Sequence, residues 1–154
     1  MSTLGVSCTT ACAFLALADG ETVAPVPDRL EPAAGLGPEE QLPVFAEDVA
    51  RVLRDCGGDR VVILQAEPRY EAGHTAWVPR LAMETLVRLE SVRAGVPCSY
   101  ISRQKVKGSL GLKGRGGLDA LGKDELASAG MYWSAGRLVA ALAAVAAERD
   151  AEAG

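Results

Sequence analysis

The segment from Arg60 to Ala66 constrains the fold of this chain more than any other. It reads RVVILQA, a nearly continuous apolar run with several β-branched residues. Such a run is typical of a central strand that is covered on both faces of a sheet. A segment with helical spacing of apolar residues precedes it and another follows it. The run therefore predicts an α/β domain with helices packed against a largely buried sheet.

The remaining elements give this sheet its order. Further strands are expected over residues 4–8, 11–18, 21–26 and 96–102. The first three should form an antiparallel meander, because Asp19-Gly20 is a strong hairpin-turn dipeptide. The strands over residues 60–66 and 96–102 need helical crossovers and should be parallel. Helices are expected over residues 38–56, 76–93 and 133–148. In the second helix, the expected core positions are Leu81, Leu86, Leu89 and Val92. The prediction is a five-stranded mixed sheet flanked by helices.

Length and composition indicate one globular domain. The chain has 154 residues, of which 49% are hydrophobic and 23% charged, values that are ordinary for a globular protein. We assign residues 1–149 to the domain and residues 150–154 to a disordered tail. With neither a signal-like start nor an apolar run long enough to span a bilayer, a cytoplasmic location without membrane contact is expected. The four cysteines contain no CxxC pair, which favours reduced thiols over a zinc site.

The charge is distributed unevenly along the chain. Residues 91–118 hold six basic and no acidic residues, whereas the rest holds 10 basic and 20 acidic ones. Five of the six basic residues lie in or beside the glycine-rich stretch over residues 102–117, which we expect to be a flexible loop: Arg103, Lys105, Lys107, Lys113 and Arg115. A basic segment in an acidic body predicts an anionic partner, either nucleic acid or an acidic protein surface.

Four segments together resemble one known superfamily. They are LGVS at residues 4–7, ILQAEP at 63–68, QKVK at 104–107 with GLKGR at 111–115, and the start of the last helix. In this order they resemble RNase H-like proteins and, within them, Holliday-junction resolvases of the RuvC type. That family carries metal-binding carboxylates on the first strand, at the end of the fourth strand and at the start of the last helix. Here the matching positions hold Ser7, Glu67, Ser134 and Arg137.

The resemblance implies a degenerate active site. Two-metal phosphodiester hydrolysis needs several carboxylates that converge on the metals, and only Glu67 remains. Arg137 would place a positive charge where a cation should bind, and it is a candidate ion-pair partner for Glu67. We therefore expect no catalytic residues and no metal cofactor. Glu71 and Asp119 are the other acids that could approach this site, so a nuclease with a relocated magnesium site stays an alternative.

The first functional hypothesis is therefore non-catalytic binding of nucleic acid, with DNA preferred to RNA. The resemblance implies that the five basic residues of the glycine-rich stretch contact phosphates. Such contacts supply affinity without reading the base sequence. The rival hypothesis is a protein-interaction module that docks the same basic loop on an acidic partner. The alanine-rich last helix would also permit a homodimer, although we expect its small residues to pack on the sheet of the same molecule.

Overall fold

The computed structural model describes residues 1–66 and 73–154, which form a mixed sheet with helices on both faces. Its strands are β1 (Ser2–Cys8), β2 (Ala13–Asp19), β3 (Thr22–Val23), β4 (Arg29–Leu30), β5 (Arg60–Leu64) and β6 (Cys98–Ile101). The order is β3-β2-β1-β5-β6, and β4 pairs with β2 as well. β1 pairs antiparallel with β2 and parallel with β5, and β5 pairs parallel with β6. The predicted mixed sheet is confirmed.

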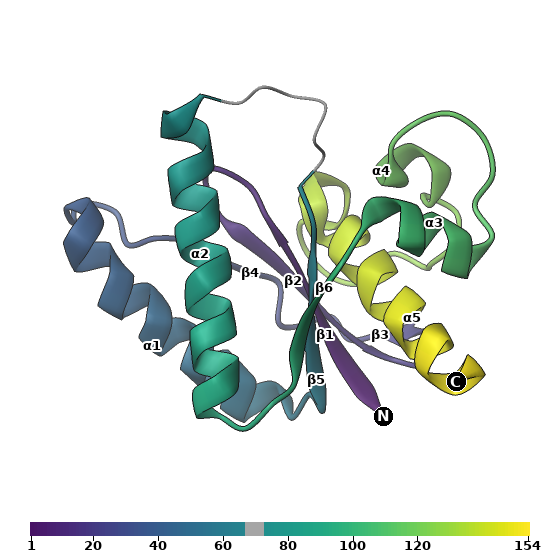
Figure 1. Ribbon diagram of the computed structural model, residues 1–154, viewed down its shortest axis with the longest axis horizontal. Helices are drawn as coiled ribbons and strands as arrows, with labels where there is room; N and C mark the ends of the chain where they lie inside the picture. Colours follow the sequence, from purple (N-terminus) through teal and green to yellow (C-terminus); the bar gives the residue numbers. More distant parts are fainter. Residues whose placement is uncertain (67–72) are drawn as a thin grey trace.

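Two groups of helices cover the sheet. Before β6 the chain forms α1 (Pro38–Cys56) and α2 (His74–Arg93). After β6 it forms α3 (Arg103–Leu110), α4 (Leu118–Leu121), a π-helical turn η1 (Trp133–Arg137) and α5 (Leu138–Ala153). Figure 1 shows α1 and α2 on one side of the sheet and α3, α4 and α5 on the other. None of the helices in residues 1–66 and 73–154 combines the length and apolarity needed to cross a membrane.

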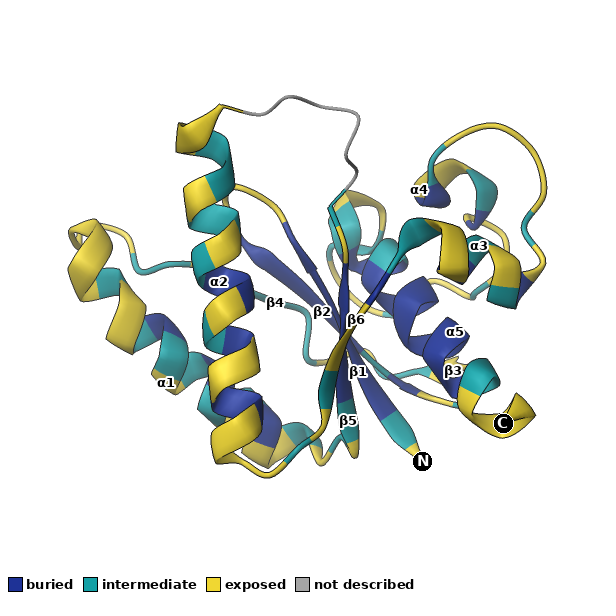
Figure 2. Ribbon diagram, in the orientation of Figure 1, coloured by how far each residue is buried: buried dark blue, intermediate teal, exposed yellow. Residues whose placement is uncertain are grey.

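The side chains of the strands alternate between two apolar cores. Val61 and Ile63 of β5 pack toward α1 and α2, whereas Val62 and Leu64 pack toward α5. This alternation follows from the two-residue period of a strand. It explains the continuous apolar run, because a strand covered on both faces needs apolar residues at every position. The three strands β1, β2 and β5 are correspondingly buried over almost their whole length (Figure 2).

The alanine-rich helix α5 lies unusually close to β1. A Cβ atom added at Gly5 would lie 2.0 Å from the carbonyl oxygen of Ala140. No side chain fits in that space, so Gly5 and the small residues of α5 are what allow this contact. Every residue from Ala140 to Ala147 is buried. The expected packing of this helix on its own sheet is confirmed.

The third strand is shorter than predicted. A single strand was expected over residues 21–26, but only Thr22–Val23 pairs with β2 there. A second short segment, β4, pairs with Ala13 and Phe14 at the other end of β2. Pro25 and Pro27 lie between the two segments and have no N–H to donate to a strand ladder. The two prolines therefore divide the partner of β2 into β3 and β4.

The orientation of α2 differs from the sequence prediction. Of the expected core positions, Val92 is 75% exposed and Leu81 is 50% exposed. The residues that α2 buries are Met83, Glu84, Val87, Glu90 and Ser91. Buried polar side chains need partners, and Glu84 has one in Arg80, whose Nε lies 3.0 Å from its Oε2. A search for apolar periodicity cannot recognise a buried face that is half polar.

Candidate nucleic-acid interface

A cavity of about 250 Å³ opens where β1 ends. We call it the β1 cleft. Side chains at the end of β1 and in α2, α3, α4 and the η1 turn contribute to its walls, among them Ser7, Arg80, Arg103, Asp119, Trp133 and Ser134. Ser7 is buried and Ser134 is exposed at the rim. Two of the four positions that the resemblance aligned with catalytic carboxylates therefore meet at one site.

Arg137 is not part of this wall, contrary to the sequence prediction. Its side chain is fully buried, and its donors serve backbone carbonyls. Nε donates to Leu15 (2.8 Å) and Nη2 donates to Ala24 (2.9 Å). Nη1 donates to Ala129 and, at 3.4 Å, to Met131. Burial lowers the pKa of the guanidinium from its usual value, and Asp28 opposes that shift. Arg137 thus joins separate backbone segments in the core.

The described carboxylates do not fit a magnesium site. Asp119 is the one carboxylate in the described wall of the cleft, and it is exposed. Within residues 1–66 and 73–154, no group of three or more His, Cys, Asp or Glu side chains is placed to hold a metal ion. Magnesium sites need hard oxygen ligands with negative charge. Glu67 and Glu71 lie outside the described residues, and so does the expected pair between Glu67 and Arg137.

Two arginines line the cleft instead. Arg103 was predicted as a phosphate contact and begins α3, while Arg80 was not predicted to be part of any site. Nε of Arg80 is held by Glu84, whereas its Nη2 is buried without a hydrogen-bond partner among the described residues. The four-residue spacing of Arg80 and Glu84 on one helix was the sequence signal that could have identified this pair.

Cys8 also lines the cleft but has no reactive thiol. Burial, reinforced by the nearby charge of Glu84, raises the pKa of Cys8 to about 12. A thiol with this pKa is protonated at neutral pH, and only a thiolate acts as a nucleophile or a metal ligand. Cys8 therefore contributes an apolar, unreactive surface to the cleft.

Residues 103–110 of the basic segment form α3, so the prediction of a flexible loop over residues 102–117 is wrong for this part, whereas residues 111–117 form no helix. Ser102 caps α3 by accepting a hydrogen bond from the backbone N–H of Lys105 (3.1 Å). Gly111 ends the helix in the left-handed conformation, with φ of 68°. Lys107 Nζ donates to the carbonyl oxygen of Gly116 (2.9 Å). This bond ties the remaining glycine-rich stretch back to α3.

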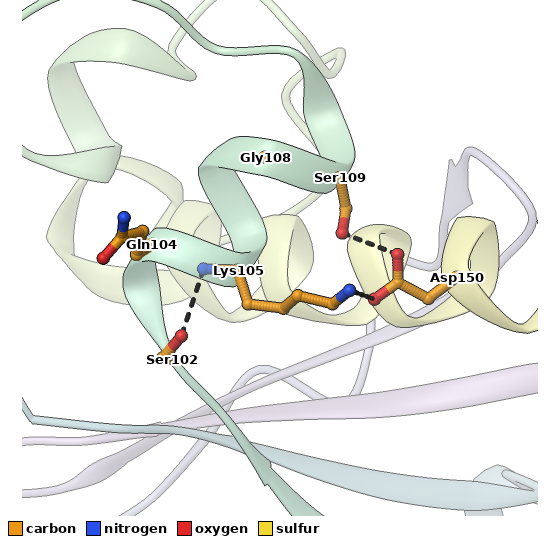
Figure 3. A pocket seen from close by; sticks show the side chains of 6 residues that line it. All are labelled: Ser102, Gln104, Lys105, Gly108, Ser109 and Asp150. Carbon is orange, nitrogen blue, oxygen red and sulfur yellow. Dashed lines mark hydrogen bonds and ion pairs between the residues drawn. The ribbon is translucent and has the colours of Figure 1, made fainter.

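The predicted phosphate-contacting residues differ in their surroundings. Lys105 Nζ lies 3.4 Å from Oδ2 of Asp150, and Oδ1 of Asp150 accepts a hydrogen bond from the hydroxyl of Ser109 (2.6 Å; Figure 3). Asp150 belongs to α5, which extends to Ala153 beyond its predicted end. Lys113 and Arg115 are exposed. α3 thus carries Arg103 at the cleft and Lys105 beside the end of α5.

Comparison with known proteins identifies the fold. No protein-family model and no curated protein sequence matches this chain. Among solved structures, it is similar to Thermus thermophilus RuvC in complex with a Holliday junction substrate, with a TM-score of 0.78 and 14% identity over 100% of this chain and 96% of that one. Another structure of T. thermophilus RuvC gives a TM-score of 0.77 and 16% identity over 100% and 97% of the two chains. The chain has an RNase H-like fold close to that of RuvC.

Proposed function

We propose that this chain is a non-catalytic RNase H-like domain that binds nucleic acid, with DNA preferred to RNA. The observation that carries the proposal is the continuity between the basic segment and the β1 cleft. Arg103 lines the cleft from the first turn of α3, and the other basic residues follow on the same helix and the adjoining stretch. The similar RuvC structure in complex with a Holliday junction supports nucleic acid as the partner.

The basic surface suits phosphate contacts. Lys113 and Arg115 are exposed, and Lys105 keeps 62% of its side chain exposed despite its ion pair with Asp150. A surface ion pair of this kind contributes about 0–1 kcal/mol, so a phosphate can replace Asp150 as its partner. If all five cationic residues contact phosphates, a plot of the logarithm of the duplex-binding constant against the logarithm of salt concentration should have a slope as steep as about −4.5.

The composition of the β1 cleft supports the non-catalytic part of the proposal. Ser7 supplies no charge for a metal, and the described wall contains two arginines and one exposed carboxylate. Purified protein should therefore leave branched and linear nucleic acids uncut in magnesium or manganese. Metal-dependent cleavage that is lost in Glu67→Gln would instead establish the alternative, a nuclease with a relocated site.

A salt titration of binding tests the proposal. Fluorescence anisotropy should compare four-way junction, duplex and single-stranded DNA with matched RNA at increasing salt. Lys113→Glu/Arg115→Glu should weaken binding and lower the salt slope by about 2. The matched control, Arg51→Glu/Arg54→Glu, makes the same charge change at exposed positions of α1, on the other side of the sheet. Absence of binding at low salt, or equal loss in both variants, would refute the proposal.

The same experiment addresses the protein-interaction alternative. If nucleic acid does not bind at low salt, an acidic protein surface becomes the predicted partner of the basic segment. A homodimer also stays a proposal, to be measured by light scattering. Because the alanine face of α5 is buried within the molecule, a dimer would have to form through another surface.

A further inference from the structure

We infer that the β1 cleft binds one phosphate group directly, through guanidinium and hydroxyl donors and without a divalent cation. The inference deepens the proposed function, because it assigns the cleft a phosphate of the bound nucleic acid. It concerns a site separate from the exposed cations of the basic segment. The site can be tested with inorganic phosphate alone, independently of nucleic-acid binding.

Arg80 provides the first support. Its Nε donates to Glu84 at 3.0 Å, which fixes the plane of the guanidinium. Its Nη2 is buried and has no hydrogen-bond partner in residues 1–66 and 73–154. A buried donor without a partner is unfavourable, and more so when it is charged. Arg80 also lines the cleft, so a phosphate oxygen there could accept a charge-assisted hydrogen bond from its guanidinium.

The other groups of the cleft are also suited to an anion. Arg103 lines the cleft, and Ser7 and Ser134 present hydroxyl groups that can donate hydrogen bonds. Phosphate oxygens accept hydrogen bonds, so they match a wall of donors. Glu84 does not line the cleft, and its charge is paired with Arg80. Asp119 is exposed, so solvent and salt screen its repulsion of an anion.

The cleft is large enough for a phosphate group, and packing of the η1 turn fixes the position of its rim. Its volume of about 250 Å³ is several times the roughly 30 Å³ that one water occupies in the liquid. The η1 turn, which carries Ser134, packs directly on Phe14. The two are so close that a Cβ atom added at Gly136 would lie 2.2 Å from the ring of Phe14. This close contact fixes Ser134 at the opening. A terminal phosphate and a backbone phosphodiester offer the same oxygen acceptors to these donors.

Calorimetric titration with inorganic phosphate in the presence of EDTA tests the site. We expect saturable binding of one phosphate, weakened at least about tenfold by Ser134→Glu, which adds a negative charge at the exposed rim. Ser128→Glu makes the same change at an exposed position outside the cleft and should bind phosphate as the wild type does. Arg80→Gln/Glu84→Gln removes both charges of the ion pair together and should also weaken binding.

Short oligonucleotides with and without a 5′-phosphate should be tested as competitors of inorganic phosphate. This comparison distinguishes a terminal phosphate from a backbone phosphodiester as the group that the site binds. Competition by the phosphorylated form alone assigns the site to terminal phosphates, and equal competition assigns it to the backbone. Absence of saturable phosphate binding in the wild type, or unchanged binding in Ser134→Glu, would overturn the inference. Nucleic-acid binding that persists in either case would leave the proposed function intact. Phosphate binding by a protein that binds no nucleic acid would refute the proposed function and keep the site.

Discussion

Replacement of Arg137 by Met should destabilise the fold strongly while leaving the wall of the β1 cleft in place. Met has a side chain of similar length but no hydrogen-bond donor. Arg137 donates to the carbonyl of Leu15 in β2, to that of Ala24 after β3, and to those of Ala129 and Met131 before η1. Its loss removes the link between these three parts of the chain.

The magnitude follows from these bonds. A hydrogen bond that involves a charged group contributes about 1.5–3 kcal/mol, so the bonds to Leu15, Ala24 and Ala129 together account for roughly 4–9 kcal/mol. Burial of the apolar Met side chain offsets about 2 kcal/mol of this loss. We expect a net loss of about 2–7 kcal/mol, a range that includes the cost of breaking a buried ion pair. This is a large part of the total stability of an ordinary domain.

Urea denaturation followed by tryptophan fluorescence measures this loss. The ring of Trp133 lies 5.7 Å from the Arg137 guanidinium carbon, so its emission reports on the same region. Ser134→Ala changes an exposed residue of the same turn and should shift stability by no more than about 0.5 kcal/mol. A loss below about 1 kcal/mol for Arg137→Met would contradict the structural role of this side chain.

Three further predictions concern other parts of the core. Gly5→Ala should lower the free energy of unfolding by about 1–3 kcal/mol and with it the midpoint of thermal unfolding, because the added methyl group meets the carbonyl of Ala140; an unchanged midpoint would disprove the close contact. Cys8 should resist alkylation at mildly alkaline pH while the protein is folded, since its pKa is raised to about 12; rapid modification detected by mass spectrometry would be inconsistent with that burial. Glu148→Ala should cost about 3 kcal/mol in urea denaturation, because the carboxylate is buried beside Arg60 (3.6 Å); wild-type stability would argue against this pair.

Local signals were sufficient to predict α1 from the sequence. Pro38 and two acids begin the helix, and Glu40 accepts a hydrogen bond from the backbone N–H of Gly37 (3.4 Å). Gly57 ends it in the left-handed conformation, with φ of 66°. Start and stop signals of this kind act within one turn of the helix, so they can be recognised before any tertiary contact is known.

α3 could not be predicted in the same way, because its stability depends on distant contacts. Gly108 lies inside the helix, and a glycine there costs about 1 kcal/mol relative to alanine. Val106 and Leu110 offset that cost by packing in the core that α5 shares with the sheet. Composition showed only a glycine-rich basic stretch. The cap at Ser102 was a local signal, but it was outweighed by the five glycines over residues 108–117.

The prediction for Arg137 failed because it assumed a continuous α-helix. Residues three apart share one face of such a helix, which would have placed Ser134 and Arg137 together in the cleft. In the structure, the N–H of Arg137 donates to the carbonyl of Tyr132, five residues earlier (3.1 Å), and Gly136 leaves helical geometry with φ of 165° and ψ of −16°. This π-type turn directs Arg137 into the core while Ser134 remains at the rim.

Arg137 therefore does not contribute to the chemistry of the β1 cleft. The repulsion of a metal by that guanidinium was part of the sequence argument, but its charge faces backbone carbonyls in the core. Among the described residues, the polar groups that line the cleft include Ser7, Ser134, Arg80 and Arg103, with Asp119 as the one carboxylate. A wall of hydrogen-bond donors attracts the phosphate that a nuclease would hold through metals. Under the proposed function, the absence of cleavage and the binding of phosphate would share one cause, the presence of hydrogen-bond donors at the end of β1 where the resemblance aligns metal-binding carboxylates.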